Sequence, residues 1–375
     1  MSETIVFFGS KIRGVALAIS IIYFFSHISI AQASNIPTKY DTNNVISLNK
    51  PDSSSICQND LILKNKEIDC IAVEGGFVVA PKEYSSQAIS SFESAHILFQ
   101  DIVGIFKGKI ALIVGMDRSD SLRGLFKANH ITSINLPTVA ERQDMIRAGI
   151  ARAIHQLNPS LSPSDTDKFT KQALELSIGQ TATATLSESG FTQHELCHAW
   201  LKVYVHDFTK GNRSPSQARA VYGTILPDWL DEAIAVSCES ETDRGRRLND
   251  LVRAKSANEL ISLTNLLEMS HPRNNRKINS EEQIASKNNK NVKVSVRIIE
   301  SGQISPTTIF YAQSYGFLKF LREFTKNQNI AEKIINEYLN NNDSVNSIKY
   351  ISSISEFNNL NLNWIKWQLQ NLSVK

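Results

Sequence analysis

The chain has 375 residues, enough for one large domain or for two moderate domains that share a core. Hydrophobic residues make up 42% and charged residues 21%, which is the composition of a globular protein. The formal net charge is only +3 and the sequence contains no block of lysine and arginine, which excludes an electrostatic nucleic-acid arm. We therefore expect no nucleic-acid partner.

The N-terminus has the order of an export signal. Two basic residues precede an apolar run at residues 15–30, and a small-residue pattern ending at Ala33 follows. This order predicts a signal peptide over residues 1–33, cleaved near Ala33/Ser34, and a mature protein that is periplasmic or secreted. The alternative is an uncleaved membrane anchor, although the run is short for a span. No later apolar stretch reaches spanning length, so we expect no stable membrane span after cleavage.

The four cysteines fall into two groups. Cys57 and Cys70 lie close together in an irregular N-terminal segment, residues 34–83. In an oxidising compartment this pair is expected to form a disulfide, and two free thiols are the alternative. Cys197 and Cys238 could pair with each other, or each could be a small buried hydrophobic residue. The sequence leaves both possibilities open.

Strands and helices can be predicted from the spacing of apolar residues. Two short apolar runs, at 61–63 and 76–80, favour a small hairpin. Next come a helix at 84–106, strands at 109–115 and 131–136, helices at 139–157 and 164–178, and a weak edge strand at 181–186. Two helices at 191–205 and 227–240 follow. After a polar connector, the remaining elements are a strand at 292–299 and helices at 309–324, 330–339 and 354–372.

The pentapeptide His-Glu-Leu-Cys-His at residues 194–198 matches the H-E-x-x-H pattern of zinc enzymes. Residues four apart on a helix project from the same face, so His194 and His198 can bind one metal ion. Glu195 lies beside them and is placed to take a proton from a reacting water. The alternative is a buried helix whose two histidines are satisfied by ordinary hydrogen bonds.

A catalytic zinc site needs a third protein ligand and one open position. One class of zinc enzyme places a third histidine six residues after the second, and here that position is Tyr204. Another class takes a glutamate from a following helix. The segment W-L-D-E-A-I-A at residues 229–235 supplies one, Glu232, which follows His198 by 34 residues.

Together the two motifs resemble the gluzincin metallopeptidases of the peptidase MA clan, in particular their M1-like branch. That branch carries W-L-N-E-G-F-A after its H-E-x-x-H. The resemblance implies a zinc ion bound by His194, His198 and Glu232, with Glu195 as general base. It also implies that Glu239, seven residues after Glu232, supports the metal site. A solvated carboxylate at a helix end is the alternative for Glu239.

A third segment, Y-A-Q-S at residues 311–314, is similar to the Y-E-x-G of the same branch. The similarity implies that Tyr311 stabilises the oxyanion formed on the scissile carbonyl. Tyr315, one helical turn later, is the alternative, and both tyrosines could instead be packing aromatics. The G-x-M-E-N segment of the M1 aminopeptidases is absent from the sequence. Aminopeptidase specificity is therefore not implied.

These observations predict an α+β, gluzincin-like metallopeptidase domain with a small β-containing N-terminal part and a helical C-terminal part. We expect a core at residues 84–270, a polar insertion at 271–291 and a helical part at 292–375. The expected function is that of an exported zinc metallopeptidase, which hydrolyses protein or peptide substrates with a metal-activated water and Glu195 as general base. The alternative is a catalytically inactive zinc-binding or peptide-binding protein on the same fold. An amide hydrolase of cell-wall peptides would use the same site.

Overall fold

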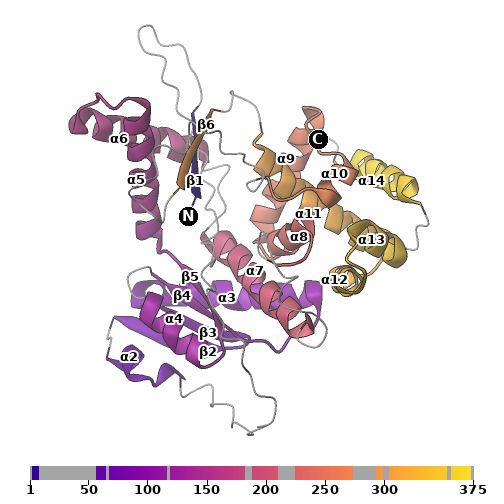
Figure 1. The fold of residues 1–375 in the computed structure, drawn as a ribbon, viewed down its shortest axis with the longest axis horizontal. Coiled ribbons are helices and arrows are strands. Elements are labelled where there is room, and N and C mark those ends of the chain that lie inside the picture. Colours follow the sequence, from indigo (N-terminus) through magenta and orange to yellow (C-terminus); the bar gives the residue numbers. More distant parts are fainter. Residues whose placement is uncertain are drawn as a thin grey trace.

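In a computed structural model of the chain, a small sheet flanked by helices adjoins a helical half (Figure 1). The structure describes residues 2–7, 56–64, 67–115, 119–181, 188–209, 224–272, 293–298, 304–352 and 356–372. The strands are β1 (Ser2–Phe7), β2 (Ile68–Val73), β3 (Gly76–Pro81), β4 (Ile110–Val114), β5 (Thr132–Leu136) and β6 (Lys293–Ile298). The helices of the sheet-containing half are α2 (Asp60–Leu63), α3 (Lys82–Val103), α4 (Ser119–Ala128), α5 (Val139–Leu157), α6 (Pro163–Thr181) and α7 (Glu188–Thr209). Those of the helical half are α8 (Asp228–Ser237), α9 (Glu241–Ser256), α10 (Leu263–Glu268), α11 (Pro306–Thr325), α12 (Ile330–Asn341), α13 (Ser344–Ser352) and α14 (Phe357–Asn371).

Several sequence predictions fall outside the described residues. They are the apolar run of the export signal with its cleavage site at Ala33/Ser34, most of the weak edge strand at 181–186, and the polar insertion from residue 273 onward. β1 lies before that apolar run and pairs in parallel with β6. Within the described ranges, none of the helices combines the length and apolar character needed to cross a membrane.

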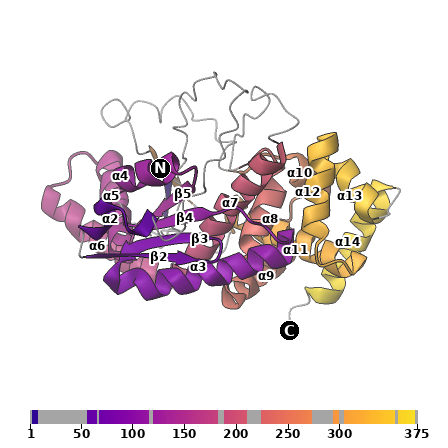
Figure 2. The same ribbon diagram turned by 90° about the horizontal axis from the view of Figure 1, so that it is seen from below.

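The main sheet has the strand order β2-β3-β4-β5. β3, β4 and β5 are parallel, and β2 is antiparallel to β3. β3 and β4 are buried on both faces, which explains their continuous apolar sequences. Alternate residues face opposite cores: Val78 and Leu112 share a core with α3 and α7, whereas Phe77 and Ile113 share one with α2 and α4. Figure 2 shows α3 running along one face of this sheet.

The predicted hairpin exists, but its first arm was placed wrongly. Residues 61–63 lie in α2, and the strand paired with β3 is β2. An apolar run of three residues is too short to distinguish a helix from a strand. The turn between the strands uses Gly75, whose φ of 83° is unfavourable for residues with a side chain. Because β2 and β3 belong to the same sheet as β4 and β5, residues 68–81 join the predicted core rather than an irregular N-terminal segment.

Two central helices connect the sheet to the helical half. α7 packs against α3 on the sheet side and against α8 on the other, and α8 packs against α11. Every residue from Trp229 to Ser237 in α8 is buried, so this helix is enclosed on all sides. The charged side chains of Asp231 and Glu232 are therefore inside the protein. Buried charges need partners, which directs attention to the junction of α7 and α8.

Candidate metal centre

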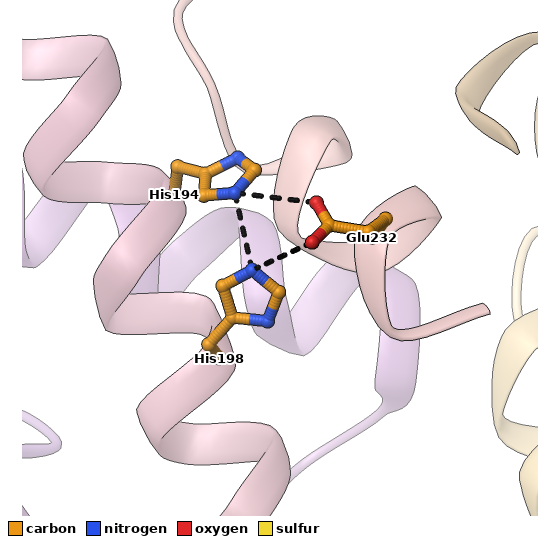
Figure 3. A group of neighbouring side chains, drawn as sticks. All are labelled: His194, His198 and Glu232. Atoms are coloured by element: carbon orange, nitrogen blue, oxygen red, sulfur yellow. Dashed lines mark hydrogen bonds and ion pairs between the residues drawn. The ribbon is translucent and has the colours of Figure 1, made fainter. Parts of the chain in front are cut away.

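Helices α7 and α8 bring three side chains to a common point (Figure 3). His194 and His198 lie on α7 and Glu232 lies on α8. The Nε2 atoms of the two histidines are 3.1 Å apart. Oε2 of Glu232 is 3.4 Å from Nε2 of His194, and Oε1 is 3.8 Å from Nε2 of His198. The structure thus brings together the three side chains that the sequence predicts as ligands. His194 and Glu232 are buried, and His198 is 9% exposed.

The second ring nitrogen of each histidine contacts a carboxylate. Nδ1 of His194 is 2.9 Å from Oε1 of Glu239. Nδ1 of His198 is 2.6 Å from Oδ1 of Asp231. An ionised carboxylate has no hydrogen to give, so each Nδ1 is assigned as the donor. In the neutral imidazole the lone pair then lies on Nε2, the atom that faces the other two ligands.

The spacing of these three ligand atoms fits a tetrahedral metal site. Zinc binds imidazole nitrogen and carboxylate oxygen at about 2.0–2.2 Å, so two ligand atoms on one ion lie about 3.3–3.6 Å apart. Of the observed separations, 3.4 Å lies within that range, 3.1 Å lies just below it and 3.8 Å lies just above it. Two imidazoles and one carboxylate form a donor set that suits zinc and leaves a fourth position open, as in catalytic sites.

The charge balance around the site also fits a divalent cation. The carboxylates of Asp231, Glu232 and Glu239 all lie against the two imidazoles. Arg247 pairs with one of them, Glu239, and so leaves two negative charges that neutral imidazoles do not offset. A divalent cation between the Nε2 atoms would balance them.

The titration behaviour of these residues reflects the same excess of negative charge. Burial alone would lower the pKa of His194, but hydrogen bonds and charges from Glu232 and Glu239 raise that pKa to about 10. Burial alone would raise the pKa of Glu232, but the charges of His198 and His194 hold it well below its ordinary value. The site therefore draws positive charge into the space between the ligand atoms, where a metal ion would replace protons.

Arg247, on α9, fixes the carboxylate that contacts His194. Its Nε and Nη2 donate to Oε2 and Oε1 of Glu239 at 3.1 and 2.8 Å. Both side chains are buried, so the structure contradicts the alternative of a solvated Glu239 at a helix end. Burial works against the charge on Arg247, but the Glu239 carboxylate raises the pKa of Arg247 above its ordinary value. The elements predicted from the sequence include no helix at α9, and Arg247 is not among the predicted site residues.

We expect Arg247→Ala to weaken zinc binding by about 10–100-fold, because it removes the group that holds the partner of His194. The change also leaves the Glu239 carboxylate buried without its pair, which is expected to cost about 3–5 kcal/mol of stability. Arg253→Ala is the matched control, because that arginine lies on the same helix and its side chain is 60% exposed. Competition with a chromophoric chelator measures zinc affinity, and thermal unfolding measures stability. Equal zinc affinity in the two variants would contradict the assigned role of Arg247.

Asp231 contacts Nδ1 of His198 in the same way that Glu239 contacts Nδ1 of His194. One carboxylate oxygen contacts Nδ1 of His198, and the other accepts hydrogen bonds from the backbone N–H and the hydroxyl of Thr224 at 3.0 and 2.9 Å. The aspartate is completely buried. Asp231 is not among the site residues predicted from the sequence, although its place directly before Glu232 in the second motif is a local signal.

The predicted polar insertion at 271–291 placed His271 in a solvated connector, and the structure contradicts this for His271. Its side chain is completely buried, and Nε2 is 3.6 Å from Oε1 of Glu232. Its backbone N–H donates to Oδ2 of Asp228 at the start of α8, which holds this residue beside the site. The polar residues that follow it suggested an exposed segment, and only the tertiary structure shows that the chain first turns inward here.

Tyr311 reaches the metal centre from α11. Its ring centroid is 5.8 Å from that of His194 and 5.5 Å from that of His271, and the guanidinium of Arg247 lies 5.1 Å from its ring. These ring contacts place Tyr311 directly beside His194 and His271. They favour Tyr311 over Tyr315 as the tyrosine associated with the ligands.

Glu195 lies on the same turn of α7 as the two histidines and is buried. It directly follows His194 in the sequence. Comparison with protein-family models, with curated proteins and with solved structures finds no match to this chain. Function is therefore inferred from the geometry of the site and from the two motifs.

Proposed function

We propose that the chain is an exported zinc-dependent metallopeptidase of the gluzincin type. The observation that carries the proposal is the convergence of His194 Nε2, His198 Nε2 and the Glu232 carboxylate, with each Nδ1 held by a buried carboxylate. Such supporting carboxylates are a regular feature of zinc-binding histidines. When bound, zinc would polarise the scissile carbonyl and lower the pKa of water.

The residues of the chain would then divide the remaining work. His194, His198 and Glu232 would bind the metal through Nε2, Nε2 and the carboxylate. Glu195 would take a proton from the attacking water at its carboxylate and return it to the leaving nitrogen. Tyr311 would stabilise negative charge on the carbonyl oxygen of the substrate.

Export is part of the same proposal. All four cysteines are paired, Cys57 with Cys70 and Cys197 with Cys238. Disulfides persist in oxidising compartments and are rare in the cytosol. This pairing supports the periplasmic or secreted location that the N-terminal sequence predicts.

A digest of a broad library of peptides and proteins tests the proposed activity. We expect the zinc-loaded protein to cleave peptide bonds, to lose activity when a chelator removes the metal, and to recover it when zinc is returned. Parallel digestion of cell-wall peptide fragments separates a general peptidase from a cell-wall amide hydrolase. Zinc binding without cleavage of any substrate would favour the inactive zinc-binding or peptide-binding alternative. Cleavage that survives removal of the metal would contradict the mechanism.

A further inference from the structure

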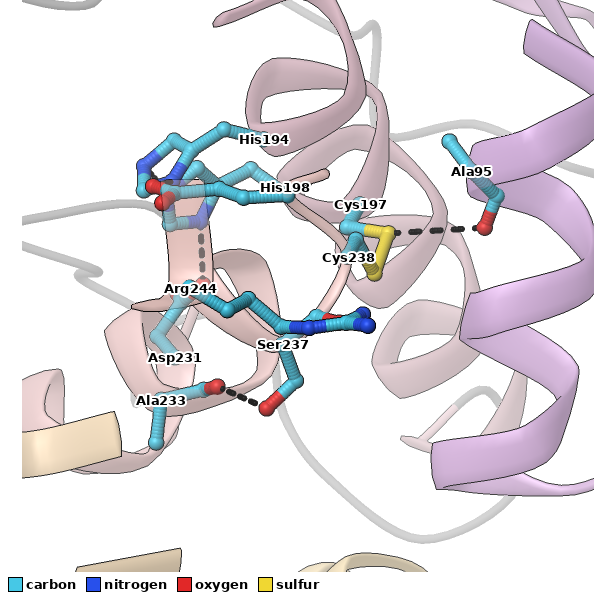
Figure 4. Close-up of a disulfide and its surroundings, with 10 residues drawn as sticks. Ala95, His194, Cys197, His198, Asp231, Ala233, Ser237, Cys238 and Arg244 are labelled. Carbon is cyan, nitrogen blue, oxygen red and sulfur yellow. Dashed lines mark hydrogen bonds and ion pairs between the residues drawn. A yellow bond between two sulfur atoms is a disulfide. The ribbon is translucent and has the colours of Figure 1, made fainter. Parts of the chain in front are cut away.

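The disulfide between Cys197 and Cys238 joins the two helices that carry the metal ligands (Figure 4). Cys197 lies on α7 between His194 and His198. Cys238 directly follows the last residue of α8 and directly precedes Glu239. The bond therefore links the helix of both imidazoles to the end of the helix of Glu232.

The position of the bond restrains the distances that matter for metal binding. Cys238 is six residues after Glu232, which places the two about 9 Å apart along the helix axis. Cys238 also directly precedes Glu239, whose carboxylate contacts Nδ1 of His194. A shift of α8 away from α7 that separated the Glu232 carboxylate from the two Nε2 atoms would also have to move Cys238 away from Cys197.

The junction needs such a restraint because its ligand atoms repel one another unless a metal ion or protons lie between them. With the imidazoles neutral, lone-pair atoms of two imidazoles and one carboxylate lie 3.1–3.8 Å apart, inside a buried region that holds two further carboxylates. Along the chain, Glu232 is 34 residues from His198, so closing this long connection carries an entropic cost. A covalent bond between the helices lowers the conformational entropy of the unfolded chain, so less entropy is lost when the chain folds.

The other disulfide provides an internal comparison. Cys57 and Cys70 are 13 residues apart, and Cys70 lies on β2 at the edge of the sheet. Both pack in the core between the sheet and helices α2 and α4. Cys197 and Cys238 belong to the separate core that contains α7, α8 and α11. Removing the first bond therefore perturbs the fold without touching the junction of the ligand helices.

We infer that the Cys197–Cys238 disulfide positions the metal centre, so that tight zinc binding requires this cysteine pair to be oxidised. The inference rests on the proposed function for the identity of the metal. The bond forms by exchange with a disulfide oxidant, which takes two electrons and two protons from the thiols and is itself reduced to two thiols. Both half-cystines are completely buried and Sγ of Cys197 lies 3.8 Å from the carbonyl oxygen of Ala95 on α3, so small thiols cannot reach the bond in the folded protein. The metal centre would thus be completed only in an oxidising compartment.

Zinc affinity of two double variants tests the inference. Cys197→Ala with Cys238→Ala removes the bond at the junction, and Cys57→Ala with Cys70→Ala is the matched control. Zinc dissociation constants are measured by competition with a chromophoric chelator, and circular dichroism establishes that each variant is folded. We expect the junction variant to bind zinc about 10–100-fold more weakly than the wild type, as for other groups that orient ligands. The control variant should stay within about threefold of the wild type.

Three results would overturn the inference or its premise, and they are distinguishable. Wild-type zinc affinity in the folded junction variant would overturn the role of the disulfide while leaving the metal centre intact. An equal loss in both variants would show a general effect of lower stability and would also overturn it. Failure of the oxidised wild type to bind zinc would instead overturn the proposed function. If the alanine pair does not fold, Cys197→Ala with Cys238→Val fills more of the buried space without the bond, and the same comparison applies to it.

Discussion

Replacing Glu232 with alanine is expected to weaken zinc binding by more than about 100-fold. The loss should exceed the 10–100-fold effect typical of residues that only support a ligand, because the Glu232 carboxylate faces both Nε2 atoms. Two imidazoles alone would leave the ion with two protein ligands, fewer than the three of catalytic zinc sites. Metal content after dialysis and chelator competition measure the effect.

Two companion variants make the Glu232 result specific. Glu232→Gln keeps the shape of the side chain but removes its charge, and should also lose most of the affinity. Glu241→Ala removes an exposed glutamate at the start of α9 and should bind zinc as the wild type does. Unchanged zinc occupancy in Glu232→Ala would show that Glu232 is not a ligand, and the site would then lack its third protein ligand.

The second large effect is expected from Glu195→Gln, which should lower kcat for peptide hydrolysis by about 10²–10⁴-fold while zinc stays bound. The amide cannot accept the proton that the carboxylate takes from water, whereas the ligand atoms on His194, His198 and Glu232 are unchanged. Steady-state kinetics on a peptide identified in the library digest, together with metal analysis of the same sample, measure both quantities.

Glu195→Asp is the matched comparison for the Glu195→Gln variant. It keeps the carboxylate but withdraws it by one methylene group, so it should retain more activity than Glu195→Gln. Full activity in Glu195→Gln would rule out Glu195 as the general base. Loss of zinc from that variant would show instead that Glu195 contributes to metal binding.

The parts of the site that the sequence predicts are those governed by local spacing. Histidines four apart on a helix must share a face, and W-L-D-E followed by small apolar residues reads as a second buried helix. Both helices are present, and α7 extends beyond its predicted range of 191–205 at both ends. α8 ends at Ser237 rather than at residue 240, so Glu239 lies just beyond the helix. β4 and α5 were likewise predictable, because a continuous apolar run and a Thr138–Glu141 capping box are local signals.

The parts that could not be predicted depend on contacts between distant segments. Arg247 matters because α9 packs beside α11 and turns one face toward the end of α8, and its own helix is too polar to reveal this. His271 is buried only because the chain folds back onto α8. The pairing of Cys197 with Cys238 is of the same kind, since the sequence favours the Cys57–Cys70 pair but does not decide whether the other two cysteines pair or remain separate.

The most direct test of the account is to locate the metal in crystals of the purified protein by anomalous scattering at the zinc edge, alongside metal analysis in solution. The account predicts one zinc ion per chain, bound by Nε2 of His194, Nε2 of His198 and the carboxylate of Glu232. A protein that retains no zinc, or an anomalous peak away from these three side chains, would contradict it.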